Sequence, residues 1–144
     1  MPIPIIGGVR SLAIGDLDGD GVAEVLLGDG WNQDYGKRAR ALLTHASWAG
    51  AAFRVEPIEN EAEQYTLEQI IAADLDGDGR PEIVTRGNAH VRVLRQSSAG
   101  WRGATVAREC RDMTALDLDG RSGKDVLALC KDTVQLLPMP GGTP

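Results

Sequence analysis

The chain has few aromatic residues and no long apolar segment. Aromatic side chains make up only 4% of its 144 residues, so small aliphatic side chains must fill most of any core. No run approaches the roughly 20 consecutive apolar residues that a membrane-spanning helix requires. Residues 1–6 lack the charged start and the long apolar stretch of a secretory signal peptide. We therefore expect neither a membrane span nor a signal peptide in this sequence.

Residues that would indicate catalysis or nucleic-acid binding are also scarce. The net charge is −6 at pH 7, and no basic cluster suggests a surface for nucleic acid. The two histidines, His45 and His90, have no serine or cysteine beside them as an activated pair. No glycine-rich loop joins a strand pattern to a helix pattern, where a phosphate site would be expected. The sequence therefore predicts a protein that is not an enzyme and does not bind nucleic acid.

An acidic segment that occurs three times dominates what is present. Its first copy, at residues 16–24, reads DLDGDGVAE, and its second, at residues 74–82, reads DLDGDGRPE. The third copy, at residues 117–125, reads DLDGRSGKD. The copies begin 58 and 43 residues apart, and repeats of such length are typical of propeller blades. Because just over half of the 21 acidic residues lie in these copies, the negative charge of the chain belongs mostly to them.

The composition of this segment predicts a calcium-binding loop. Carboxylates at positions 1, 3, 5 and 9 and a backbone carbonyl at position 7 can supply most of the about six to eight oxygen ligands that calcium takes. We expect two calcium ions per chain. The predicted ligands of the first ion are Asp16, Asp18, Asp20, Glu24 and the carbonyl of Val22. Those of the second are Asp74, Asp76, Asp78, Glu82 and the carbonyl of Arg80.

The third copy is predicted to hold no metal ion. Arg121 replaces the carboxylate at position 5, and Ser122 replaces the glycine at position 6. We expect Arg121 to pair with the remaining carboxylates and to leave the loop at Asp117 empty.

An EF-hand begins with the same D-x-D-x-D-G pattern, but it ends with a glutamate at position 12 and lies between two helices. Here position 12 is Leu27 in the first copy and Thr85 in the second, and neither side chain can chelate as glutamate does. Short apolar runs precede and follow each copy, which is typical of strands. Each segment is therefore predicted to join two antiparallel strands.

These residues resemble the FG-GAP or VCBS repeat, which forms the β-propeller of integrin α-subunits and occurs in many bacterial surface proteins. The resemblance rests on IGDLDGDG and EVLLG at residues 14–21 and 24–28, and on ADLDGDG and EIV at residues 73–79 and 82–84. It extends over nearly the whole chain in three units. It implies four-stranded blades in which each loop joins the innermost and second strands and binds calcium. Glutamate at position 9 departs from the usual aspartate of the family.

The fold class that we predict is an all-β propeller with three four-stranded blades in a single domain, residues 1–144. The C-terminal residues 138–144 are rich in proline and cannot form the last strand of the third blade, so residues 2–6 are predicted to complete it as an edge strand. Three blades cannot close a ring, because propellers have about four to eight blades. We expect closure as a six-bladed homodimer, and the alternative is that the chain is a piece of a longer propeller. The predicted blades are residues 11–57, 67–108 and 112–137.

Cys110 and Cys130 lie on either side of the third loop. If Asp117 faces Asp125 in a strand pair, Asp112 faces Cys130 and Cys110 lies one diagonal step away, within reach of a disulfide. Two separate buried thiols are the alternative. The expected lack of a metal ion in this loop favours the disulfide.

Trp31 and Tyr35 lie in a polar loop and are candidates for contact with a protein or glycan partner, although such a loop more often packs on its own blade. The function that we predict is a binding or scaffold module in which calcium is mainly structural. The alternatives are a non-catalytic propeller part of an extracellular carbohydrate-active enzyme and an isolated repeat fragment that assembles with itself. An extracellular, periplasmic or cell-surface location is expected, because cytosolic calcium is too low to fill weak sites.

Overall fold

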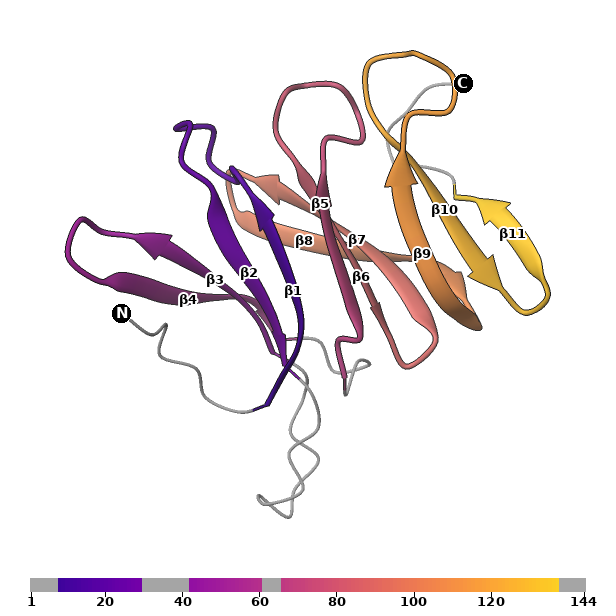
Figure 1. Cartoon of the computed structure of the whole chain (residues 1–144), viewed down its shortest axis with the longest axis horizontal. Coiled ribbons are helices and arrows are strands. Elements are labelled where there is room, and N and C mark those ends of the chain that lie inside the picture. The colour runs from indigo at the N-terminus through magenta and orange to yellow at the C-terminus, as the bar shows by residue number, and fades with distance from the viewer. Residues whose placement is uncertain (1–7, 30–41, 61–65, 138–144) are drawn as a thin grey trace.

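The computed structural model describes residues 8–29, 42–60 and 66–137, which form eleven β-strands in three antiparallel sheets (Figure 1). No helix occurs among these residues, and thus none that is long and apolar enough to cross a membrane. The first sheet has the order β1 (Val9–Gly15), β2 (Glu24–Asp29), β3 (Leu42–Trp48), β4 (Phe53–Asn60). The second has the order β5 (Gln69–Ala73), β6 (Glu82–Gly87), β7 (His90–Ser97), β8 (Gly100–Arg108). The third has the order β9 (Cys110–Leu116), β10 (Asp125–Cys130), β11 (Thr133–Leu136).

Each acidic segment connects the first two strands of a sheet, as the flanking apolar runs predict. In the first sheet Gly15 faces Glu24 across the hairpin, and in the second Ala73 faces Glu82. The segments are therefore the turns of antiparallel hairpins, and the prediction of an all-β chain without EF-hand helices is confirmed for the described residues.

The three sheets stack side by side, and their first strands β1, β5 and β9 follow one another along the stack (Figure 1). One apolar cluster fills the space between the first and second sheets and includes Leu26, Ile70 and Ile83. A second cluster lies between the second and third sheets and includes Val84 and Val126. The second sheet is thus buried on both faces, which is why β6 has consecutive apolar residues instead of an alternating pattern.

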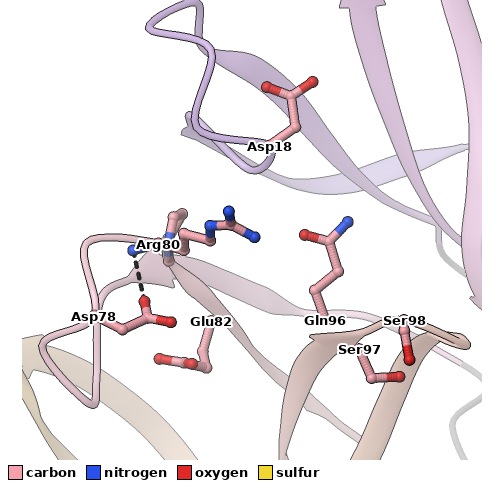
Figure 2. A pocket seen from close by; sticks show the side chains of 8 residues that line it. Asp18, Asp78, Arg80, Glu82, Gln96, Ser97 and Ser98 are labelled. Atoms are coloured by element: carbon pink, nitrogen blue, oxygen red, sulfur yellow. Dashed lines mark hydrogen bonds between the residues drawn. The ribbon is translucent and has the colours of Figure 1, made fainter.

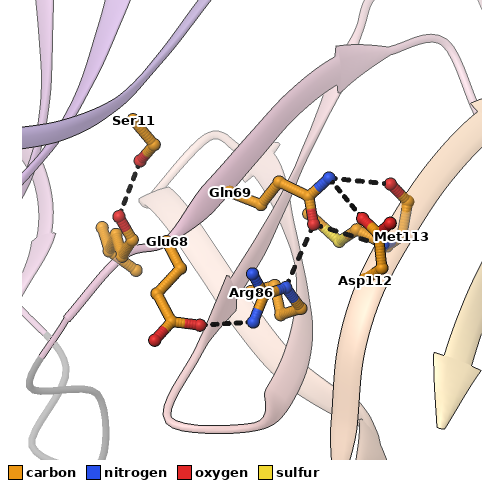
Figure 3. Close-up of polar contacts among 7 residues, drawn as sticks. Ser11, Glu68, Gln69, Arg86, Asp112 and Met113 are labelled. Carbon is orange, nitrogen blue, oxygen red and sulfur yellow. Dashed lines mark hydrogen bonds and ion pairs between the residues drawn. The ribbon is translucent and has the colours of Figure 1, made fainter.

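Small residues allow the first strands to approach one another closely. A Cβ atom added to Gly15 would lie 2.8 Å from the Cβ of Ala72, which leaves no room for a larger side chain. On the same face of β1, the hydroxyl of Ser11 donates a hydrogen bond to the carbonyl oxygen of Leu67 at 2.8 Å (Figure 3). Steric fit and a polar contact therefore both join the first two sheets.

A polar bridge joins the second and third sheets (Figure 3). The amide nitrogen of Gln69 donates to the carboxylate of Asp112 at 2.9 Å and to the carbonyl oxygen of Met113 at 3.0 Å. Its amide oxygen accepts from Nε of Arg86 at 3.0 Å. The hydrogen bond from Gln69 lowers the pKa of Asp112 below its ordinary value, and a further one from the Met113 amide adds to this effect.

Cys110 and Cys130 form a disulfide that joins β9 and β10, so of the two alternatives the structure has the bond. The predicted register was wrong by one residue, because Leu116 faces Asp125. A bulge at Arg111 then absorbs one residue of β9 and places Cys110 directly opposite Cys130.

The structure has three open sheets, and the third contains three strands among the described residues. The edge strand predicted at residues 2–6 lies outside these residues, as do Trp31 and Tyr35. A closed propeller and a six-bladed dimer remain predictions.

Candidate metal centres

The first acidic loop is wound around the carboxylate of Asp16, which stands at the end of β1. Its two oxygens accept hydrogen bonds from the backbone amides of Gly19 at 2.8 Å and Gly21 at 2.9 Å. Both glycines have left-handed φ values, +79° and +86°, which other residues rarely adopt. The glycine positions are therefore required for the backbone to curl around a single carboxylate.

A second carboxylate closes the base of each loop. Oε2 of Glu24 accepts a hydrogen bond at 2.8 Å from the amide of Leu17, and Glu82 accepts one from Leu75 at the same distance. In the third loop Asp125 plays this part, accepting from the amide of Leu118 at 3.1 Å. The second strand of each hairpin thus places an acidic side chain beneath the turn.

Burial affects the carboxylate of Glu82. Desolvation raises its pKa above the ordinary value, and the hydrogen bond from Leu75 opposes this shift only in part. The charges of Asp76 and Asp78 raise the pKa further, while that of Arg95 lowers it. A bound cation would favour the ionised form that this environment disfavours.

Each loop brings three carboxylates together at one point. One oxygen from each member of a trio lies within 4.8 Å of the other two. Such clustered oxygens are the ligands that calcium and other hard cations prefer, so the donor set fits a divalent ion. The trios are Asp16, Asp18 and Glu24; Asp74, Asp76 and Asp78; and Asp117, Asp119 and Asp125.

Some predicted ligands lie outside these trios. Asp20 is not a member of the first, and Oδ1 of Asp20 accepts a hydrogen bond from the amide of Val22 at 2.7 Å. Asp78 accepts likewise from the amide of Arg80 at 2.8 Å, and Glu82 is not a member of the second trio. The two loops therefore share a backbone shape but gather different carboxylates.

The third loop departs from the other two in the way that its sequence suggests. Nε of Arg121 lies 3.3 Å from Oδ2 of Asp119, so the expected pairing of Arg121 with a loop carboxylate is present. Because Ser122 occupies the second glycine position, the left-handed conformation moves to Gly123, whose φ is +100°. The loop still gathers an acidic trio, and its lack of a metal ion stays a prediction.

The three loops lie along one edge of the stack (Figure 1). The third packs on the second, since the amide of Lys124 donates to the carbonyl oxygen of Asp74 at 2.7 Å. A Cβ atom added to Gly77 would lie 2.6 Å from Cβ of Ser122, so the close approach requires glycine. The second and third loops are thus in direct contact.

A polar cleft of about 380 Å³ lies between the first and second loops (Figure 2). Arg80 extends into this cleft toward the first loop, and Gln96 lines it from the C-terminal end of β7. The lining offers carboxylates, a guanidinium, an amide and hydroxyls but no aromatic ring. The lining residues are Asp18, Asp78, Arg80, Pro81, Glu82, Gln96, Ser97 and Ser98.

Arg95 of β7 is a charged residue of this region that the sequence did not single out. Its Nη1 lies 3.4 Å from Oδ2 of Asp76 in the second loop. The sequence did contain a signal for this residue, because β6 and β7 are joined by a tight turn in which Gly87 faces His90. Moving away from the turn along both strands brings Arg95 opposite Glu82.

The two histidines take part in polar contacts on the sheets. Nε2 of His45 lies 3.5 Å from Oε2 of Glu56, and Nε2 of His90 lies 3.2 Å from Nη1 of Arg108. Neither contact joins a histidine to a serine or cysteine nucleophile.

The chain matches none of the protein-family models compared with it, and none of the curated proteins compared with it is similar in sequence. The resemblance to the FG-GAP repeat therefore rests on the sequence motifs alone.

Proposed function

We propose that the chain is a calcium-stabilised β-propeller module that acts as a binding or scaffold unit, and that calcium holds it together without being its target. The observation that carries this proposal is the clustering of three carboxylates within 4.8 Å in a hairpin turn, repeated along one edge of the stack. Like charges at such distances repel one another, and a divalent cation removes the repulsion.

The first and second loops are the ones that we assign to calcium. Asp16, Asp18 and Glu24 would hold the ion in the first loop, and Asp74, Asp76 and Asp78 in the second. Calcium would supply positive charge at the point where the carboxylates meet. Because the second loop packs against the third, an ion in the second loop would also strengthen the contact between those two sheets.

Calorimetric titration of the chelator-treated protein with calcium tests this assignment. We expect two ions per chain, with Asp16→Asn and Asp74→Asn each removing one. Three equivalent sites would contradict the expected empty third loop, and no binding at all would refute the proposal.

We further propose that a second copy of the chain completes the propeller. Leu12 and Ile14 point outward from the first sheet and are 59% and 62% exposed. Relative to the first loop, they occupy the same positions in β1 that Ile70 and Ala72 occupy in β5 relative to the second loop. Ile70 and Ala72 pack against the first sheet. The outer face of the first sheet therefore has the pattern of a face that another sheet covers.

The other end of the stack offers the complementary face. Val134 and Leu136 of β11 are 67% and 58% exposed, and they lie opposite Leu129 and Leu127 on the same side of the third sheet. Two copies joined through these unlike faces, twice around, would close a ring of six blades. The binding partner of such a ring would be a protein or a glycan in calcium-rich surroundings outside the cytoplasm.

A further inference from the structure

We infer that Arg95 is a built-in counter-cation of the second loop, which competes with calcium there and makes this loop the weaker of the two calcium sites. The inference rests on the proposed function, because it concerns the relative strength of the same loops.

The position of Arg95 is the first reason. Its Nη1 lies 3.4 Å from Oδ2 of Asp76, and the two side chains are only 28% and 31% exposed. Partial burial reduces the screening of this pair by water. Asp76 belongs to the acidic trio, so the same carboxylate would be needed by a bound calcium ion.

The remaining nitrogens of Arg95 give the second reason. Nε and Nη2 are buried, and the structure gives them no hydrogen-bond partner among the described residues. Among the described residues, the ion pair with Asp76 is therefore the polar contact that the structure gives this guanidinium. Leaving buried donors unpaired is costly, so the attraction to the loop carboxylates must offset that cost.

The matching place of the first sheet holds no cation and serves as an internal comparison, although Arg80 of the second loop extends toward the first loop. In the second sheet Ile83 faces Leu94, so Arg95 stands one step further along, opposite Glu82. In the first sheet Val25 faces Ala46, and the same step leads to Ser47.

The acidic trios differ in the same sense. The trio of the first loop includes Glu24, whereas that of the second omits Glu82. In the second loop Asp76 would thus have two positive charges to neutralise, Arg95 and a bound ion.

Calcium must separate Asp76 from Arg95 and then remain beside a fixed positive charge. Both effects weaken binding at the second loop. In calcium-free protein the same guanidinium reduces the repulsion among the carboxylates, so the second loop depends less on calcium for its fold. The chain would therefore have one tight loop that fixes the structure and one weak loop that responds to calcium concentration.

Calorimetric titration of the full chain with calcium tests this inference. Arg95→Ser introduces the residue found at the matching place of the first sheet, and Arg95→Gln keeps a long polar side chain if the serine variant folds poorly. The matched control is Arg102→Ser, which removes an equal charge from an exposed position on β8, the residue facing Arg95. Asp74→Asn combined with Arg95→Ser identifies the loop responsible.

We expect wild-type protein to show two unequal dissociation constants. Arg95→Ser should lower the dissociation constant of the weaker site by about fivefold or more, as expected when a nearby like charge is removed. The dissociation constant of the tighter site should stay unchanged. Arg102→Ser should change neither by more than about twofold, and Asp74→Asn should abolish the gain.

An unchanged or weakened second site in both Arg95 variants would overturn the inference while leaving the proposed function intact. If Arg95→Ser and Arg102→Ser increased the calcium affinity of the second site equally, this would also overturn the inference, because the effect would then come from net charge. Failure of wild-type and variant proteins alike to bind calcium would refute both the inference and the proposed function.

Discussion

Glu82 shows how a single buried carboxylate can depend on a cation. Burial raises its pKa, so calcium-free folded protein holds its proton to a higher pH than unfolded protein does. The stability of the chelated protein should therefore fall as the pH rises from the ordinary carboxyl range through the raised pKa. Bound calcium should remove this loss, because it favours the ionised carboxylate.

Glu82→Gln separates the two effects. Without calcium we expect the melting temperature to rise by about 2–4 °C, because a neutral amide costs less to bury and its oxygen can still accept from Leu75. With calcium the variant should melt below the wild type, because a charged group beside the ion is lost. The control is Glu109→Gln, whose surface pair with Lys131 contributes little. Destabilisation of the variant under both conditions would show that Glu82 is not strained by its burial.

At the scale of the elements, Gly15 sets the distance between β1 and β5. We expect Gly15→Ala to destabilise the protein by about 1–3 kcal/mol, since the added methyl group would meet Ala72 at 2.8 Å and force the strands apart. Gly8→Ala is the matched control, because a Cβ there meets no atom within 4 Å. Equal urea-unfolding midpoints for the two variants would contradict the close approach.

The disulfide between β9 and β10 is a second feature that stabilises the pairing of individual strands. It closes a loop of 20 residues of chain, and removing it should cost about 2–4 kcal/mol of stability. Cys110→Ser with Cys130→Ser should thus lower the urea midpoint, and reducing agent should shift wild-type protein by a similar amount. If neither treatment changes the midpoint, the third sheet does not depend on the bond.

The acidic hairpins could be predicted from the sequence because their information is local. Glycines at fixed places and apolar runs on either side determine a turn between two strands. The register of β9 and β10 was missed because the bulge at Arg111 depends on the pairing of whole strands. Arg95 was missed for a similar reason, since its meeting with Asp76 requires the register of β6 and β7 in addition to the loop.

At the scale of the whole molecule, the exposed ends of the stack predict self-association. Sedimentation should give a dimer in calcium, and Ile14→Asp should give a monomer, because a charge on the outer face of the first sheet cannot be buried without a partner. Arg102→Asp is the control, at an exposed polar position on β8, the outer strand of the second sheet. A wild-type monomer at all concentrations would contradict closure by a second copy.

If calcium holds the three sheets together, the protein should melt at a higher temperature with calcium than with a chelator, and thermal unfolding measures this directly. Each occupied site should add about 2.7 kcal/mol when calcium is a hundredfold above its dissociation constant. Two sites should therefore raise the melting temperature by about 10 °C or more, and the rise should shrink in Asp16→Asn. Equal melting temperatures with calcium and with chelator would contradict the claim.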